Sequence, residues 1–264
     1  MRVSGAEARG FLQGLFTCDV ERVSPDAPAF GALLTPQGKI ITDFIVSQQG
    51  DAFWLDAPRE LTADLLKRLR LYRLRAQIDL ADLSEAMGVL AIWGDAPAPE
   101  GAQPDPRDPR LGVRCIMERA ALTSDPDARL AYEAQRIACG IPEGGQDFAY
   151  GEAFPHEANM DLIGGVDFKK GCYVGQEVVS RVHHRGTARR RILTATLAGP
   201  APAPGTLVLA GEIEVGTLGA SAGAHALASI RLDKAQDASA AGTQITAGGV
   251  PLTLGALPSR AARG

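Results

Sequence analysis

The sequence predicts an α+β protein with antiparallel sheets, followed by a small C-terminal β-barrel. Helical and strand-like segments in the first part of the chain do not alternate as the β–α–β units that build parallel sheets. After about residue 186, short β-rich runs follow one another, and glycine and proline separate them at the spacing of about 8–12 residues that is typical of a barrel or sandwich. At 264 residues the chain exceeds the usual size of one domain. We therefore predict two domains, over residues 1–186 and 187–264.

The N-terminal segment predicts a helix and then a three-stranded meander. Ser4 and Glu7 have the spacing of a capping box, and the apolar residues that follow recur at helical spacing, so we expect a helix over about residues 5–17. The next segment, AFGALLTPQGKIITDFIV, contains two β-rich runs around a Pro-Gln-Gly turn, and AFWLDA follows a Gly-Asp turn. These three runs predict consecutive antiparallel strands.

The middle of the chain predicts two further helices and two strands. Asp56 is expected to cap a helix whose leucines, up to Leu69, form an apolar stripe. The runs MGVLAIWG and LGVRCIMER predict strands that a proline-rich loop separates. Residues 127–139 predict a helix that ends at Gly140, with Pro142 just beyond it.

Composition excludes several classes of protein. The hydrophobic fraction of 45% and charged fraction of 22% are those of a globular protein rather than a disordered one. A net charge of −4 gives no overall field that attracts nucleic acid or anionic membrane. There is no apolar signal segment and no apolar run long enough to span a bilayer, so we predict a cytoplasmic protein. The four cysteines lie far apart in the sequence, without zinc-like or cluster-like spacing, so we expect no stably bound metal.

The segment KKGCYVGQE, residues 169–177, contains the most distinctive cysteine. Val174, Val178 and Val182 have helical spacing, so a helix is predicted to begin near Gly171, with Cys172 in its first turn. There the helix dipole and two neighbouring lysines would favour a reactive thiolate. The alternative is a small buried side chain, which is the commoner state of an isolated cysteine.

The run Lys170–Glu177 resembles the K-G-C-Y-x-G-Q-E motif of the YgfZ-like folate-binding proteins, which are relatives of the glycine-cleavage aminomethyltransferases. FLQGLFTCDV, LLTPQGKIITDFIV, RIACGIPEGGQD and PHEANMD are similar to other segments of that family, although Cys18 stands where the family usually has asparagine. SRVHHRGTARRR looks most like the branch that contains the mitochondrial assembly factor for four-iron clusters. The resemblance covers essentially the whole chain.

This resemblance implies an aminomethyltransferase-like folate-binding domain and a C-terminal β-barrel. It also implies a protein that binds tetrahydrofolate, or a one-carbon derivative, and supports assembly or repair of iron–sulfur clusters in client enzymes, including those that modify tRNA. Its partners would be folate and iron–sulfur client or assembly proteins, and Cys172 would be its functional centre. The residues expected to contact the cofactor are Lys170, Gly171, Tyr173, Gly175, Gln176, Glu177 and Arg181.

Two alternatives make different demands on the sequence. The aminomethyltransferases carry two adjacent aspartates in the hairpin where this chain has Thr42-Asp43. Asp43 is therefore a candidate catalytic carboxylate, which would manage protons in a one-carbon transfer to or from tetrahydrofolate. The second alternative is that the chain is a folate-sensing module that performs no reaction, in which case neither Cys172 nor Asp43 is needed.

Two kinds of folate contact remain open. A carboxylate can accept from the adjacent N–H groups of a pterin, and Glu177 ranks first because it lies in the motif; the other candidates are Glu133, Asp147 and Glu157. The basic cluster at residues 181–191 would bind a folate tail, an RNA phosphate or an acidic protein face, or it is a solvated linker. The lack of interleaved aromatic residues disfavours RNA contact.

Overall fold

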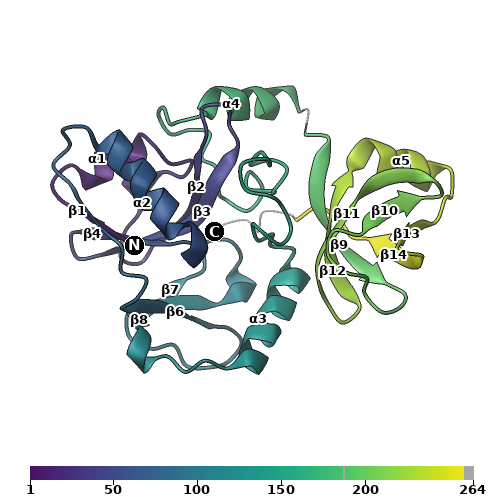
Figure 1. The fold of residues 1–264 in the computed structure, drawn as a ribbon, viewed down its shortest axis with the longest axis horizontal. Coiled ribbons are helices and arrows are strands. Elements are labelled where there is room, and N and C mark those ends of the chain that lie inside the picture. Colours follow the sequence, from purple (N-terminus) through teal and green to yellow (C-terminus); the bar gives the residue numbers. More distant parts are fainter. Residues whose placement is uncertain (187, 259–264) are drawn as a thin grey trace. The chain divides into compact units, whose positions relative to one another are not determined.

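The structure, a computed structural model, describes residues 1–186 and 188–258, and Figure 1 shows its elements. The chain forms two compact units: Met1–Ser124 with Gly164–Val178, and Asp125–Ile163 with the chain from Val179 onward. Residues 125–163 group with the barrel because helix α3 (Pro126–Cys139) packs against two barrel strands. The boundary predicted after residue 186 stays a prediction, and Thr187 and residues 259–264 of that second domain lie outside the described residues.

A five-stranded antiparallel sheet forms the centre of the first unit. Its order is β2 (Ala29–Leu34), β3 (Ile40–Gln49), β4 (Ala52–Asp56), β1 (Arg2–Ser4) and β5 (Asp79–Ala81). The predicted meander is confirmed, because β2 pairs with β3 and β3 with β4. The sequence did not predict β1 and β5, since three residues are too few to show an alternation of apolar and polar side chains.

Two helices pack against the core of this sheet. They are α1 (Ala8–Gln13) and α2 (Arg59–Arg73). Leu12 of α1 and Leu69 of α2 belong to one buried apolar cluster, in which the rings of Phe16 and Phe44 lie 4.3 Å apart. A cluster of this kind supplies most of the stability of such short helices.

The predicted starts of both helices were wrong. Ser4 ends strand β1, and Glu7 does not close a capping box; its carboxylate instead accepts from the N–H of Gln77. The first helix is therefore shorter than predicted. Helix α2 begins after Pro58, and Asp56 ends strand β4 instead of capping the helix. In both places a side chain that the local sequence predicted as part of a helix cap makes a tertiary contact instead.

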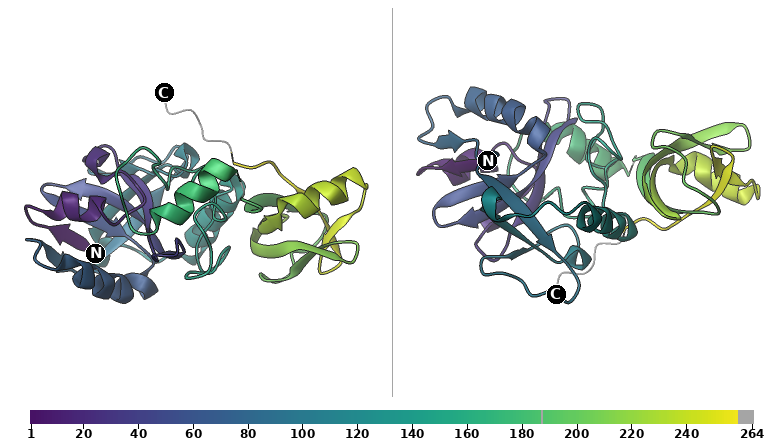
Figure 2. Two further views of the ribbon diagram at one scale, coloured as in Figure 1. Left: turned by 90° about the horizontal axis from the view of Figure 1, so that it is seen from above. Right: turned by 60° about the horizontal axis from the view of Figure 1, so that its bottom comes forward.

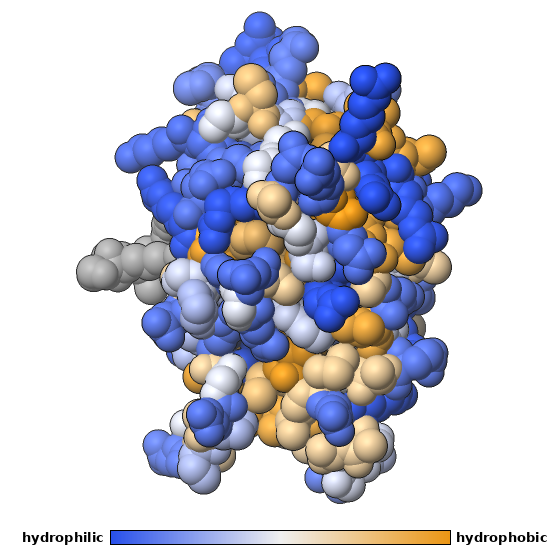
Figure 3. Space-filling model, turned by 90° about the vertical axis from the view of Figure 1, so that its left-hand side faces the viewer, coloured by the Kyte–Doolittle hydropathy of each residue, from blue (hydrophilic) through white to orange (hydrophobic). Residues whose placement is uncertain are grey.

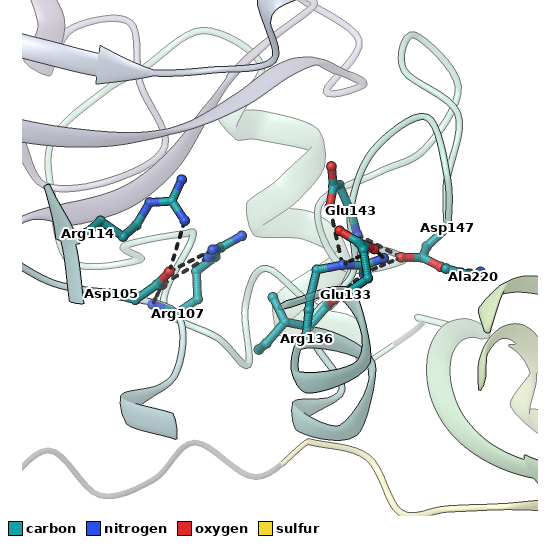
Figure 4. A network of polar contacts seen from close by, with 9 residues as sticks. Asp105, Arg107, Arg114, Glu133, Arg136, Glu143, Asp147 and Ala220 are labelled. Carbon is teal, nitrogen blue, oxygen red and sulfur yellow. Dashed lines mark hydrogen bonds and ion pairs between the residues drawn. The ribbon is translucent and has the colours of Figure 1, made fainter. Parts of the chain in front are cut away.

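A second, three-stranded sheet has the order β6 (Met87–Ile92), β8 (Val113–Glu118) and β7 (Gln103–Pro104). The predicted strands around MGVLAIWG and LGVRCIMER are confirmed. Asp105, which is 4% exposed, holds the proline-rich loop by accepting two side-chain bonds from Arg107, at 2.7 and 3.0 Å (Figure 4). Burial opposes the charge of Asp105, but these bonds keep the pKa of its carboxyl below the ordinary value. Short 3₁₀ helices lie at Val20–Arg22, Pro109–Leu111 and Arg119–Ala121.

The second unit contains α3 and a closed six-stranded barrel. Helix α3 ends where predicted, because Gly140 takes a left-handed conformation with φ 72°. The barrel order is β10 (Leu207–Ala210), β11 (Ile213–Ala222), β12 (His225–Arg231), β9 (Arg190–Leu197), β14 (Val250–Leu254) and β13 (Ile245–Ala247), and Figure 2 shows this closed ring. Helix α5 (Leu232–Ala240) was not predicted from sequence. The predicted α+β fold with a C-terminal barrel is confirmed.

One face of the molecule is largely polar. Figure 3 shows one face on which hydrophilic residues predominate and apolar residues are interspersed. Among the described residues, no helix combines the length and the apolar character that crossing a membrane requires. Large apolar side chains that are exposed include Leu71, Leu74, Leu130 and Ile213.

Candidate functional site

Cys172 lies on an exposed loop that connects Asp167 to helix α4 (Gln176–Arg185). The other three cysteines, Cys18, Cys115 and Cys139, are buried. Both ends of the loop are fixed by side chains. The Asp167 carboxylate accepts from the N–H groups of Lys169 and Lys170, at 2.7 and 3.0 Å, and the Gln176 side chain accepts from the N–H of Tyr173 at 3.2 Å. The thiol therefore faces solvent on a loop with defined ends.

The predicted position of Cys172 in the first turn of a helix was wrong. Helix α4 begins at Gln176, four residues after the cysteine. Gly175 takes a positive φ of 80°, which interrupts the helical backbone between the two. The valine spacing was a correct signal for α4 but did not reveal this interruption. The helix N-terminus therefore cannot supply the dipole contact expected for Cys172, because that effect is confined to the first turn.

The side chain of Lys170 is hydrogen-bonded to the backbone of the first unit. Its ammonium donates to the carbonyl oxygens of Gln13, Phe16 and Cys18, at 2.8, 2.6 and 2.7 Å. An ammonium has three N–H donors, so these three bonds leave none for the Cys172 sulfur. Burial lowers the pKa of Lys170 below its ordinary value of 10.5. The predicted support of the thiolate by this lysine is corrected: Lys170 anchors the loop to the end of α1.

Thr17 connects the three segments that carry the sequence motifs. Its hydroxyl donates to the carbonyl of Gly165 at 2.6 Å and accepts from the N–H of Ala32 on β2 at 2.8 Å. Its own carbonyl accepts from the N–H of Asp167 at 2.9 Å. Thr17 has no exposed surface, so these bonds are sheltered from water. The segment FLQGLFTCDV thus supports the start of the thiol loop.

The β2–β3 hairpin packs directly against the end of the loop. A Cβ atom on Gly175 would lie 2.5 Å from the carbonyl oxygen of Thr35, and one on Gly38 would lie 3.0 Å from Val178. Both glycines also have positive φ. Gly171 differs, because a Cβ atom there would meet open space. The motif glycine at 175 is needed for packing, whereas packing makes no such demand at 171.

The remaining predicted cofactor contacts are divided between core and surface. Tyr173 is 9% exposed, and burial raises the pKa of its hydroxyl to about 12. The Lys170 ammonium lies 5.3 Å from the centre of its ring. Glu177 and Arg181 are exposed residues of α4. The structure therefore brings Lys170 and Tyr173 together, packs Gly175 against the β2–β3 hairpin, and leaves Glu177 and Arg181 exposed on α4.

Asp43, the candidate carboxylate of the hairpin, lies on β3 opposite Ala32 of β2. It is partly buried, and it stands between Thr42 and Phe44, which are both buried. Side chains alternate along a strand, so Asp43 points away from the face on which Phe44 packs against Phe16. It is thus placed on the sheet face opposite the main core of the first unit.

Of the four carboxylates considered for the pterin, two are held by Arg136 in the second unit (Figure 4). Arg136 donates to Asp147 at 2.6 Å and to Glu133 at 2.9 Å, and it is fully buried. Burial works against its charge, but the two carboxylates raise the pKa of Arg136. Asp147 also accepts from the N–H of Ala220 on β11 at 2.8 Å. These contacts assign Asp147 and Glu133 a role in the structure of the unit.

Glu157 also has a local structural contact, because it accepts from the N–H of Phe154 at 2.9 Å. Two buried polar residues in the same segment were not predicted from the sequence. His156 is 2% exposed, with its ring 6.2 Å from that of His183, and burial lowers its pKa. Asn159 is fully buried at φ 57°, and within the described residues its side-chain oxygen accepts no hydrogen bond. Asparagine tolerates positive φ, which was the one signal available for it in the sequence.

The loop residues do not by themselves fit a folate. A flat pterin with a glutamate tail needs free N–H donors, acceptors and positive charge on one wall. At the loop, the Lys170 ammonium and the Gln176 amide oxygen already have backbone partners, and Tyr173 is buried. We therefore derive no step through folate from this loop.

Comparison with known proteins agrees with the fold. Residues 1–98 match the family model described as "GCVT N-terminal domain", and residues 189–258 match "CAF17, C-terminal beta-barrel domain". The chain thus contains a GcvT-like N-terminal domain and a CAF17-type C-terminal barrel. A crystal structure of the glycine cleavage system aminomethyltransferase T from Bartonella henselae has a TM-score of 0.73 over 97% of this GcvT-like chain and 82% of its own, at 14% identity. That likeness concerns the fold alone.

Curated relatives of this GcvT-like protein carry the name iron–sulfur cluster assembly factor IBA57, mitochondrial, or a homolog of it. The relative from Mycosarcoma maydis is 35% identical over 76% of this chain and 56% of its own length, and the human protein is 32% identical over 78% and 66%. A relative from Chaetomium globosum is 36% identical over 83% and 60%. The chain thus spans about three fifths of the length of these relatives.

The names of these relatives overturn the predicted cytoplasmic location, because they point to mitochondria. That prediction rested on the lack of an apolar signal segment. Such a criterion cannot separate cytoplasmic from mitochondrial proteins, since mitochondrial targeting segments are amphipathic and rich in arginine rather than apolar.

Proposed function

We propose that this chain supports the assembly or repair of iron–sulfur clusters in client proteins, with the Cys172 thiol as its functional centre. The curated relatives named as iron–sulfur cluster assembly factors support this role. The observation that carries it is the exposure of Cys172 on an anchored loop, while Cys18, Cys115 and Cys139 are buried. We include enzymes that modify tRNA among the proposed clients.

The chemistry required of Cys172 is that of an iron ligand. Cysteine thiolates hold iron–sulfur clusters, and a cluster can pass between proteins by exchange of such ligands. In this step the Cys172 thiol releases its proton to solvent as the sulfur–iron bond forms, and a thiolate of the donor protein leaves the iron. The cluster is cargo here, and the fixed ends of the loop hold the sulfur where a partner can reach it.

The experiment measures several four-iron enzymes in cells that lack this protein. Wild type is expected to restore their activities, while Cys172→Ala and Cys172→Ser are not. Lys67→Ala is the control, because Lys67 is an exposed lysine of helix α2 and does not belong to the loop. Equal rescue by wild type and by Cys172→Ala would contradict the proposal.

Accessibility of the thiol is tested directly with iodoacetamide on the native protein. One label per chain is expected, at Cys172, because the buried cysteines are shielded until the chain unfolds. Burial also raises the pKa of the Cys18 thiol to about 12, which keeps it protonated. Peptide mapping that places the label on another cysteine would remove the structural basis of the proposal.

Tetrahydrofolate is the proposed ligand, on the general ground that GcvT-like domains form a folate-binding family. Equilibrium dialysis with tetrahydrofolate is expected to show equal binding by wild type and Cys172→Ala. If no saturable binding were found, the proposed role in cluster assembly would remain, but without folate as a ligand.

One-carbon transfer is the second candidate, and the partly buried carboxylate of Asp43 on the hairpin favours it. In that case Asp43→Asn abolishes turnover of a tetrahydrofolate substrate while Cys172→Ala retains it. If both variants behave as wild type in both assays and still bind folate, the folate-sensing hypothesis is the better one.

A further inference from the structure

The end of helix α2 presents large apolar side chains to solvent. Residues 71–75 are all exposed, and among them Leu71, Tyr72 and Leu74 are exposed by 71%, 37% and 89%. Together with Arg70, Arg73 and Arg75 they form what we call the Leu74 surface. Apolar side chains gathered in this way on a globular unit commonly mark a contact site.

Leu74 occupies a backbone position that suits glycine. The N–H of Ala76 donates to the carbonyl of Arg73 at 2.8 Å, which closes a tight turn with Leu74 at its first central position. Its dihedral angles, φ 46° and ψ −106°, are those of a type II′ turn, in which this position is normally glycine. A leucine is strained there, and burial does not compensate, because the side chain stays in water. The fold therefore gives no reason for a leucine at this turn.

A groove lies beside the Leu74 surface, between α1 and the end of α2, which are neighbours in Figure 1. Its volume is about 620 Å³, and Gly10 and Phe11 form one wall while residues 72–76 form the other. A space of this size accommodates several side chains. The groove is concave, so it suits an inserted segment better than a flat membrane surface.

The rim of the groove is positively charged. Arg70, Arg73 and Arg75 are exposed, and no carboxylate of the described residues lies within 4.0 Å of their guanidinium groups. Glu7, which also lines the groove, is bound to the backbone N–H of Gln77. The whole chain has a net charge of −4, so this positive field is local. Arg73 Nε donates to the backbone carbonyl of Ala76 at 3.4 Å, but none of the three guanidinium groups pairs with a carboxylate of the described residues. Around an apolar centre, they favour a partner that brings carboxylates.

We infer that the Leu74 surface docks an acidic segment of a partner protein, in which aspartate or glutamate flanks large apolar side chains. The apolar side chains pack against Leu71 and Leu74 and enter the groove, while the carboxylates pair with the arginines. A second copy of this chain fits less well, because a two-fold interface would bring the same arginines face to face. The inference goes beyond the proposed function and makes no use of Cys172.

A display library of random twelve-residue peptides, selected on the immobilised full chain, tests this inference. Enriched peptides are expected to combine Asp or Glu with Leu, Phe or Trp. For a synthetic copy of the strongest peptide, Leu74→Gly and Arg73→Glu are each expected to weaken binding by at least about tenfold. Leu130→Ala is the matched control, because Leu130 is also exposed, by 67%, on helix α3, and it should leave binding unchanged.

Two further measurements distinguish a loss of binding from a loss of folding and test for other kinds of partner. Leu74→Gly should melt at the same temperature as wild type or higher, since glycine relieves the strained turn; a lower melting temperature would mean that the leucine serves the fold and would overturn the inference. It would also fail if no peptide were enriched, or if the enriched peptides bound Leu74→Gly as tightly as wild type. Binding to phosphatidylserine vesicles that Leu74→Gly abolishes would assign the surface to membranes, and a dimer that the same variant dissociates would assign it to self-association.

Discussion

Each unit of this protein contains a cation held by hydrogen bonds, half-buried Lys170 in the first and fully buried Arg136 in the second, and the two are satisfied in different ways. In the first unit the Lys170 ammonium donates to three neutral carbonyl oxygens. In the second unit the Arg136 guanidinium meets the carboxylates of Glu133, Glu143 and Asp147, besides the carbonyl of Ile141. The difference appears in their pKa values. Burial lowers that of Lys170, whereas carboxylates outweigh burial and raise that of Arg136.

Both cations fasten a loop to a neighbouring element. Arg136 binds the segment after α3, and Asp147 continues the connection to the N–H of Ala220 in the barrel. Lys170 binds the thiol loop to the end of α1. The comparison shows that a lysine beside a cysteine in a motif does not have to act on the sulfur. The position of Lys170 in the sequence suggested an electrostatic effect on the thiol, but its contacts show that it anchors the loop.

The largest effect is expected from Arg136→Met. Removing the guanidinium leaves the carboxylate of Asp147 buried without its cation, which typically costs about 3–5 kcal/mol of unfolding free energy. Urea denaturation followed by circular dichroism measures this loss. Arg129→Met is the matched control, because Arg129 is exposed on the same helix, and it should change little. A loss below about 1 kcal/mol would show that the carboxylates find water or other partners.

A smaller loss is expected from Lys170→Met. Three carbonyl oxygens lose their donor, but neutral oxygens are less costly to leave unpaired than a buried carboxylate, so we expect a loss of about 2–3 kcal/mol. The same denaturation experiment measures it, with Lys169→Met as the control for the exposed neighbour. If Lys170→Met lost more stability than Arg136→Met, the ranking of neutral and charged partners would be reversed.

The two motif glycines provide a comparison within the thiol loop itself. Gly175→Ala is expected to lose roughly 2 kcal/mol, because its φ is positive and a Cβ atom would meet the Thr35 carbonyl. Gly171→Ala should be nearly neutral, since the added methyl faces open space. Thermal unfolding of both variants checks the difference. Equal losses would mean that the hairpin moves away from Gly175 at little cost.

The same glycines show how far sequence reasoning reached. The meander, α3 and the barrel follow from periodicity and turn residues, and the structure contains them. Periodicity also predicted α4 from its valines, but it could not show that Gly175 delays the helix until Gln176. The partners of Lys170 were equally hidden, because all three of them, Gln13, Phe16 and Cys18, are more than 150 positions away in the chain. Contacts between distant segments decide what a motif residue does, and a single sequence does not contain them.

The smallest effect separates the two cations by pH, since lysine titrates in an accessible range and arginine does not. Between the lowered pKa of folded Lys170 and the ordinary value of 10.5, the unfolded chain holds more protons at this site than the folded chain. Stability contributed by Lys170 should therefore rise with pH, by at most about 1.4 kcal/mol per pH unit, and level off above 10.5. The measurement is the difference in unfolding free energy between wild type and Lys170→Met, taken at several pH values. The same difference between wild type and Arg136→Met should stay flat over this range. A wild-type advantage that shrank as pH rose would show that the three carbonyls stabilise the ammonium more than burial penalises it.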